Sequence, residues 1–228
     1  MMKTWRLNPV IDFINTICNY IVLNMVFLIT CLPVFTIGAA AAALDYVSLR
    51  EARGEYGYLV RTYFRELKRS FKTGTAAFLI LFPIGGILVF NLLFWPAQGN
   101  SFSFAVTGIL ILVSVVWLVI FHYTFALIGR FVNTPLQSVK NAWGLALRNL
   151  KGTLLLLAID VCAACFCLFL PLSKVIMAMC GFGFVFLAYC RCRIFRKIFT
   201  PYEEQDRGSK KQSILREHAD MMTGTSQY

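Results

Sequence analysis

The feature that most constrains this chain is its charge distribution. The run from Thr73 to Gly129 contains no Asp, Glu, Lys or Arg, and neither does the run from Phe13 to Leu44. A bilayer core about 30 Å thick takes about 20 apolar residues in a helix, so the longer run is sufficient for two crossings. Hydrophobic residues make up 58% of the chain and charged residues 14%. A soluble helix would instead alternate polar and apolar faces.

The apolar segments predict an all-α fold, a polytopic transmembrane helical bundle of about five spans. The expected spans lie within residues 15–42 and at about 74–95, 104–128, 152–170 and 175–195. Residues 1–202 would form the transmembrane domain. Residues 203–228 are polar and are expected to form a flexible cytoplasmic tail. One alternative stays open, because residues 13–44 could cross once or fold back at Pro33 as a re-entrant pair.

The net charge of +11 predicts membrane orientation. Lys and Arg gather in residues 50–72, in residues 130–151 and from Arg191 onward. Cytoplasmic loops are enriched in these residues, so the basic segments and the C-terminus are expected inside and the N-terminus outside a bacterial plasma membrane. A re-entrant first segment would bring the N-terminus inside. The absence of a folded module with a basic groove argues against nucleic-acid binding.

Two basic segments are predicted to form amphipathic cytoplasmic helices at the membrane surface. From Tyr56, apolar residues recur at helical spacing, and a basic face fills the polar positions: Arg61, Arg65, Lys68, Arg69 and Lys72. The second helix begins at Asn133-Thr134-Pro135, a capping residue before proline, and runs to Leu150. An apolar face beside a basic face favours contact with anionic lipid. The alternative is that both helices pack on the rest of the protein.

Asp160 and His122 form the candidate intramembrane polar site. Asp160 lies near the middle of the fourth predicted span, where a carboxylate costs at least about 2.5–3.5 kcal/mol and therefore needs a partner or a wet cavity. His122 lies in the third span and could pair with it. These residues could line a path for an ion, proton or substrate, or fix the helix arrangement. Asn15, Asn19 and Asn24 are expected to form hydrogen bonds across helices.

Nothing in the sequence indicates a catalytic or metal site. The eight cysteines lie in or beside apolar segments and are expected to be free thiols. Cys162, Cys165 and Cys167 have metal-like spacing but lack the second motif and the turn of a zinc site. The phosphate-binding loop and the hydrolase and dinucleotide motifs are also absent. No cofactor is therefore predicted, and we expect a protein that is not an enzyme.

The end of the first apolar stretch resembles the signature of the YesL-like family of bacterial membrane proteins. The motif runs from Leu32 to Ala40 and includes Leu32, Pro33, Thr36 and Gly38. Further similarity lies in residues 63–72, 129–131 and 140–149. The family is built around a domain of unknown function, and its members often lie in gene neighbourhoods for carbohydrate uptake. The resemblance implies a bacterial plasma membrane protein and a link to sugar transport, and it transfers no catalytic residue.

These observations lead to two functional hypotheses. The first is an accessory or regulatory partner of a membrane assembly for carbohydrate uptake, with anionic lipid and sugar-permease subunits as partners. The alternative is a small transporter or channel that uses Asp160 and His122. A third class, an intramembrane enzyme, would need a clustered and water-accessible set of polar side chains.

Overall fold

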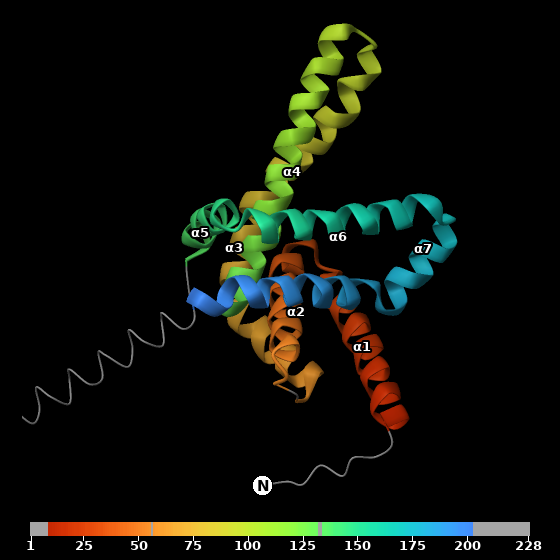
Figure 1. Cartoon of the computed structure of the whole chain (residues 1–228), viewed down its shortest axis with the longest axis vertical. Helices are drawn as coiled ribbons and strands as arrows, with labels where there is room; N and C mark the ends of the chain where they lie inside the picture. Colours follow the sequence, from red (N-terminus) through yellow and green to blue (C-terminus); the bar gives the residue numbers. More distant parts are fainter. Residues whose placement is uncertain (1–8, 56, 132–133, 203–228) are drawn as a thin grey trace, which may run out of the picture.

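The structure is a computed structural model that describes residues 9–55, 57–131 and 134–202. All regular secondary structure in these ranges is helical (Figure 1). The predicted tail over 203–228 lies outside the described residues, as do Tyr56 and Asn133.

The described helices confirm an all-α fold with five helices long and apolar enough to cross a membrane. The α-helices are α1 (Pro9–Cys31), α2 (Ile37–Ala52), α3 (Leu59–Phe94), α4 (Ser101–Arg130), α5 (Pro135–Arg148), α6 (Leu150–Phe169) and α7 (Leu172–Ala178). Short 3₁₀ turns follow α1 (Val34–Thr36) and α3 (Pro96–Gln98). A π-helical turn (Met179–Gly183) joins α7 to a further helix over residues 184–202. The candidate spans are Ile14–Cys31, Leu59–Gln98, Ser101–Arg130, Leu150–Phe169 and Leu172–Tyr202.

The first charge-free stretch forms two helices. The chain leaves α1 at Cys31, reverses through Pro33 and the 3₁₀ turn, and returns as α2. In Figure 1 the start of α1 and the end of α2 point to the same side of the molecule. The chain therefore folds back at Pro33, which was the alternative left open by the sequence. Only α1 of this pair is among the candidate spans.

The alanine-rich α2 lies at the centre of the fold, where it contacts α1, α3 and α4. Glycines let the backbones touch. A Cβ added at Gly38 of α2 would lie 2.3 Å from the carbonyl oxygen of Gly74 in α3. A Cβ added at Gly129 of α4 would lie 2.6 Å from the carbonyl oxygen of Ala42. Close approach through small residues is the usual way in which membrane helices gain packing energy.

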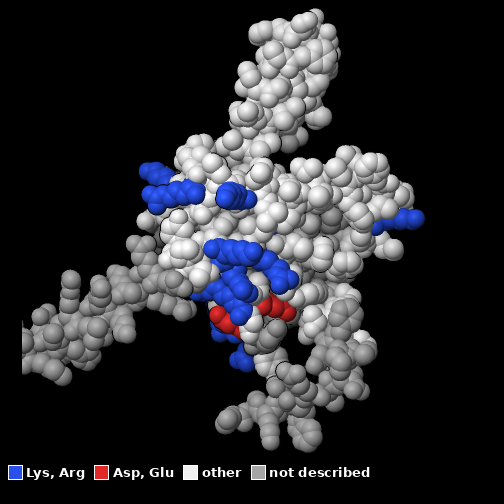
Figure 2. All heavy atoms as spheres, viewed as in Figure 1, with Lys and Arg blue, Asp and Glu red and all other residues white. Residues whose placement is uncertain are grey.

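The α3–α4 hairpin extends beyond the region in which it packs against the other helices (Figure 1). Trp117 of α4 covers Gly85, where a Cβ would lie 2.4 Å from the indole ring, and its indole N–H donates to the carbonyl of Leu81. Beyond this contact the hairpin projects away from the other helices as an arm (Figure 1). Figure 2 shows this arm without charged side chains on the visible face. Large apolar side chains on it are exposed, with Phe90 at 66%.

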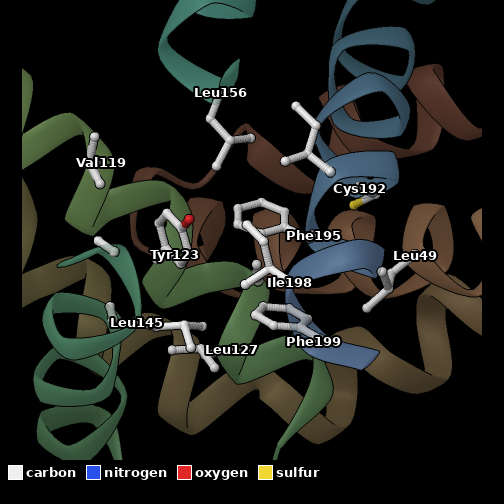
Figure 3. Close-up of a cluster of buried hydrophobic side chains, with 14 residues drawn as sticks. Leu49, Val119, Tyr123, Leu127, Leu145, Leu156, Cys192, Phe195, Ile198 and Phe199 are labelled. Atoms are coloured by element: carbon white, nitrogen blue, oxygen red, sulfur yellow. The ribbon is translucent and has the colours of Figure 1, made fainter. Parts of the chain in front are cut away.

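A second core forms where α4, α5, α6 and the 184–202 helix meet. Figure 3 shows Tyr123, Leu156, Phe195 and Phe199 pointing toward one another in this cluster. The hydroxyl groups of Tyr123 and Thr153 also lie 3.0 Å apart, in hydrogen-bonding distance. In Figure 1, α6 and the 184–202 helix run across the direction of the arm. The two long hairpins thus leave a common centre in different directions.

Asn24 fastens α1 to the π-helical turn. Its amide nitrogen donates to the carbonyls of Met179 (3.0 Å) and Cys180 (2.7 Å). Its amide oxygen accepts from the backbone N–H of Val185 (3.3 Å). A π-helical turn disturbs the regular backbone ladder, and here a side chain from another helix bonds to two of its carbonyls. The prediction that Asn24 forms hydrogen bonds across helices is confirmed.

Replacing Asn24 with leucine is expected to lower stability by about 1–3 kcal/mol, because the Met179 and Cys180 carbonyls lose their cross-helix donor. Thermal unfolding in detergent, followed by size-exclusion chromatography, measures the change. Asn19→Leu on the exposed face of the same helix is the matched control and should unfold like the wild type. Equal unfolding of the two variants would contradict a structural role for Asn24.

Candidate functional site

The structure brings His122 and Asp160 together. His122 Nε2 of α4 lies 3.0 Å from Asp160 Oδ2 of α6, an ion-pair distance when the imidazole is protonated. The two side chains are 15% and 12% exposed. Apart from each other, these two atoms have no hydrogen-bond partner among the described residues. The contact therefore joins two of the candidate membrane spans, in which an unpaired polar group would be costly.

Arg191 completes the cluster, and the sequence analysis missed its role. Its Nη2 and Nε atoms donate to Asp160 Oδ1 at 2.6 and 3.1 Å. In the sequence, Arg191 belongs to the last of the basic segments that predict membrane orientation. A signal for the pairing exists, because Asp160 and Arg191 each lie about three helical turns from the basic end of their helix. Adjacent antiparallel helices place such positions at equal depth.

This cluster neutralises its own charges. Arg191 compensates the Asp160 carboxylate with a charge-assisted hydrogen bond, and His122 covers the other carboxylate oxygen. Three elements, α4, α6 and the 184–202 helix, are held at one point. None of the described residues forms a group of three or more His, Cys, Asp or Glu side chains that could hold a metal ion. What the arrangement does is hold these helices in register through a charge-compensated contact.

Asp45 brings the central helix α2 to the same region. Burial raises the pKa of its carboxyl to about 7, and the positive charge of Arg191 opposes that rise. The thiol of Cys192, next to Arg191, donates to the backbone carbonyl of Asp45 at 3.3 Å. The helix that carries Arg191 is thus attached to both α6 and α2.

The raised pKa of Asp45 predicts a pH-dependent stability. At pH values between the ordinary pKa of 3.8 and about 7, the folded protein keeps a proton that the unfolded chain releases. Stability should therefore fall as pH rises through this window and stay level above it. Asp45→Asn removes the titration, so the variant should gain stability over the wild type between pH 5 and pH 8. Thermal unfolding of both proteins across this range measures the difference, and a constant difference would contradict the prediction.

The predicted basic face lies on α3, and the segment that carries it is helical as expected. It does not form a helix of its own, because α3 runs without a break from Leu59 through the apolar span to Phe94. Four of the five basic residues are exposed and carry no ion pair to a described residue: Arg61, Arg65, Lys68 and Lys72. Phe64 and Phe71 are exposed beside them. An aromatic and basic surface therefore stands at one end of this helix.

Arg69 is also exposed but differs from the other four because its guanidinium is paired within the protein. It forms a salt bridge with Glu66, whose carboxylate is buried and also accepts from the Ser70 hydroxyl at 3.0 Å. Arg69 Nη2 also donates to the backbone carbonyl of Gly129 at 2.7 Å. The cation thus satisfies a free carbonyl at the C-terminal end of α4, where a positive charge is favourable. Its main role in the fold is to tie α3 to α4.

The second amphipathic segment is α5. Its start confirms the predicted cap, since Thr134 accepts from the backbone N–H of Gln137 at 3.4 Å and Pro135 is the first helical residue. One face packs on the protein through buried Ala142 and Leu145. The opposite face exposes three large apolar residues, Leu136, Trp143 and Leu147. This helix therefore combines the two alternatives, packing on one side and an apolar surface on the other.

The family-motif residues build the reversal between α1 and α2. Pro33 lies in the break, and the Thr36 hydroxyl lies in hydrogen-bonding distance of the carbonyls of Thr30 (2.5 Å) and Pro33 (2.6 Å). Gly38 makes the backbone contact with α3, and Leu32 is exposed. The family motif therefore has a structural explanation in this fold.

All eight cysteines are free, and Cys162 and Cys165 are exposed on α6.

The five apolar helices and the internally compensated charges are those of a membrane-like helical protein and are compatible with several passes through a bilayer. Comparison with protein families adds one match, to a family described as "Protein of unknown function, DUF624", over residues 20–92. This segment covers the second half of α1, all of α2 and nearly all of α3, the elements joined by the Pro33 reversal and the Gly38–Gly74 contact. No curated protein and no solved structure matches the chain.

Proposed function

We propose that this protein is a non-enzymatic membrane protein that assists or regulates a larger membrane assembly. The observation that carries the proposal is the α3–α4 arm, which packs only on itself beyond Trp117 and presents apolar residues on its outer faces. Two small positions on these faces, Gly86 and Gly108, have nothing within 4 Å of an added Cβ. Small exposed residues allow close approach of a partner helix. The resemblance to the YesL-like family suggests a sugar permease as the partner.

The same helix offers a second contact outside the apolar region. α3 carries the arm at one end and the exposed Arg61, Arg65 and Lys68 at the other. A partner lying along α3 would therefore meet both surfaces. Rim charges of this kind mainly affect association rate and specificity, whereas the apolar contact contributes more of the affinity. A partner that docks along α3 would not need to displace the helices that surround the central helix α2.

The proposal includes a bacterial plasma membrane location with the basic ends of the helices in the cytoplasm. The excess of Lys and Arg there supports this orientation. The reversal at Pro33 favours an N-terminus on the same side, in place of the external N-terminus expected from the sequence. This arrangement would also place the basic residues Lys3 and Arg6 on the cytoplasmic side, where such residues are enriched.

Transport through Asp160 and His122 is the weaker hypothesis. Asp160 accepts two hydrogen bonds from Arg191, so its carboxylate is engaged within the protein. The surface grooves at α5, α6 and α3 are lined by other residues. An ion or substrate path would need an opening that reaches Asp160. Flux that is lost in a stable Asp160 variant would favour transport.

The test is purification of the full chain from its native membrane in mild detergent, with mass spectrometry of the proteins that accompany it. We expect stoichiometric recovery of permease subunits with the wild type. Gly86→Leu combined with Gly108→Leu should reduce that recovery, because the added side chains block a close helix contact and start from Cβ positions in open space. Gly181→Leu is the matched control, since this glycine is also open but lies outside the arm. Arg61→Gln combined with Arg65→Gln tests the second contact.

Recovery of the protein alone, or only with itself, would overturn the accessory role. Equal recovery with the arm variant and the control would overturn the assignment of the arm as the contact. A partner set without permease subunits would refute the link to carbohydrate uptake while leaving an accessory role.

A further inference from the structure

We propose that a groove between the α5–α6 junction and the 184–202 helix binds the phosphate headgroup of an anionic phospholipid. The groove has a volume of about 950 Å³, which is large enough for a lipid headgroup. It is separate from the His122–Asp160–Arg191 cluster and from the α3 surface. The inference does not depend on the accessory role proposed above.

Four cationic side chains line this groove: Arg148, Lys151, Arg193 and Lys197. All four are exposed, and none forms an ion pair with a described carboxylate. No Asp or Glu is among the lining residues. Arg196 also borders the groove, but its guanidinium donates to the carbonyl of Ala52 and is engaged by the end of α2. Arg193 is also stacked over the Tyr189 ring, which leaves its charge without a carboxylate partner. Four cations without a carboxylate partner around one hollow favour a ligand with net negative charge.

The position of the groove selects a lipid rather than a soluble anion. Arg148 and Lys151 flank the first residue of the α6 span, and Arg193 and Lys197 lie in the last turns of the span that ends at Tyr202. Both pairs therefore lie where apolar helix gives way to basic residues, as expected at the headgroup level of a membrane. Figure 2 shows basic groups over this part of the body, in contrast to the arm.

Apolar side chains continue the groove toward the membrane interior. Leu150 and Leu155 of α6 are exposed on its wall, where acyl chains could lie. The two helices meet closely at Gly152, because a Cβ there would lie 2.6 Å from Cδ1 of Ile198. The side chain of Asn149, which also lines the groove, donates to the carbonyl of Leu145 and does not cap α6. The positive end of the α6 dipole therefore lies beside the cations. A phosphate with attached acyl chains matches both the cations and the apolar wall.

The test uses the full chain in nanodiscs and in detergent, with a phosphatidylglycerol lipid as the anionic probe and phosphatidylcholine as the zwitterionic one. Native mass spectrometry counts bound lipids, and titration with short-chain phosphatidylglycerol gives the affinity. Lys151→Gln combined with Lys197→Gln should weaken anionic lipid binding roughly tenfold to thirtyfold. Both side chains are exposed, so the fold should be retained, and thermal unfolding checks this.

Lys140→Gln combined with Lys174→Gln is the matched control, because it removes the same charge from two exposed positions outside this groove. We expect the control to bind phosphatidylglycerol within about twofold of the wild type. Equal weakening in both variants would overturn the proposal in favour of general surface attraction. Equal binding of phosphatidylcholine would overturn the selectivity for anionic lipid. Competition by inorganic phosphate at the affinity of the lipid would assign the groove to a soluble anion instead. Recovery of partner proteins is measured separately, so failure here leaves the accessory role untouched.

Discussion

Replacing Gly74 with leucine is expected to separate α2 from α3 and to prevent recovery of the folded protein. A Cβ at this position would lie 2.8 Å from Cα and 2.9 Å from the backbone nitrogen of Ala39. Both are main-chain atoms of a buried helix and cannot move aside as a flexible side chain can. Overpacking costs about 1–3 kcal/mol when side chains adjust, and a backbone clash at the centre of the fold should exceed that range. Gly74→Ala is expected to destabilise the protein less than Gly74→Leu, because alanine adds only the Cβ atom.

The measurement is the amount of monodisperse protein after detergent extraction, together with its thermal midpoint. Gly86→Leu is the matched control on the same helix, because no atom lies within 4 Å of its added Cβ. We expect the control to fold and Gly74→Leu to aggregate or to unfold far below the wild type. Normal folding of Gly74→Leu would show that the α2–α3 contact is not needed for stability.

Replacing Asp160 with asparagine should destabilise the protein by about 3–5 kcal/mol, because it leaves the Arg191 guanidinium without its counter-charge. The Arg191 side chain is 22% exposed, so water compensates only part of this loss. Arg191→Gln should have a comparable effect through the unpaired Asp160. The double variant removes both charges and should recover much of the lost stability, as a coupled pair requires.

Thermal unfolding of the four proteins gives the coupling energy. Glu55→Gln is the control, because it breaks an exposed salt bridge with Arg50 that should contribute less than about 1 kcal/mol. Additive losses in the Asp160 and Arg191 variants would contradict a paired role. The double variant also decides between the functions of this cluster. A stable double variant that loses a measurable substrate flux would support transport, whereas retained partner recovery would support the accessory role.

The length of the apolar runs, the position of the charges and the helix-breaking residues were sufficient to predict the five long apolar helices. The charge-free run from Thr73 to Gly129 predicted two spans joined by a short turn, and these are α3 and α4. Pro33 marked the break in the first apolar stretch, and Thr134-Pro135 marked the start of α5. Such features act locally or through the bilayer, which requires every backbone polar group in a span to be bonded within its own helix. A single sequence is therefore informative about them.

Contacts between distant segments depended on the tertiary structure. The sequence placed Asp160 and His122 in neighbouring spans, but Arg191 became their partner only through the antiparallel packing of α6 against the last helix. Arg69 belonged to a basic face by helical spacing, yet packing of α4 turned it toward Glu66 and Gly129. The periodicity of one helix specifies which residues share a face. It does not specify which face meets a neighbour, because that choice depends on the shape and charge of both helices.

The sequence by itself thus determined an all-helical membrane protein with five apolar helices and basic connecting segments. The tertiary structure alone decided that the alanine-rich α2 occupies the centre, where glycines of α2, α3 and α4 allow the helix backbones to come into contact. It also decided which charges face one another. The physical reason is that burial of a charge is tolerated only with a partner, and the identity of that partner is a property of the packed helices together.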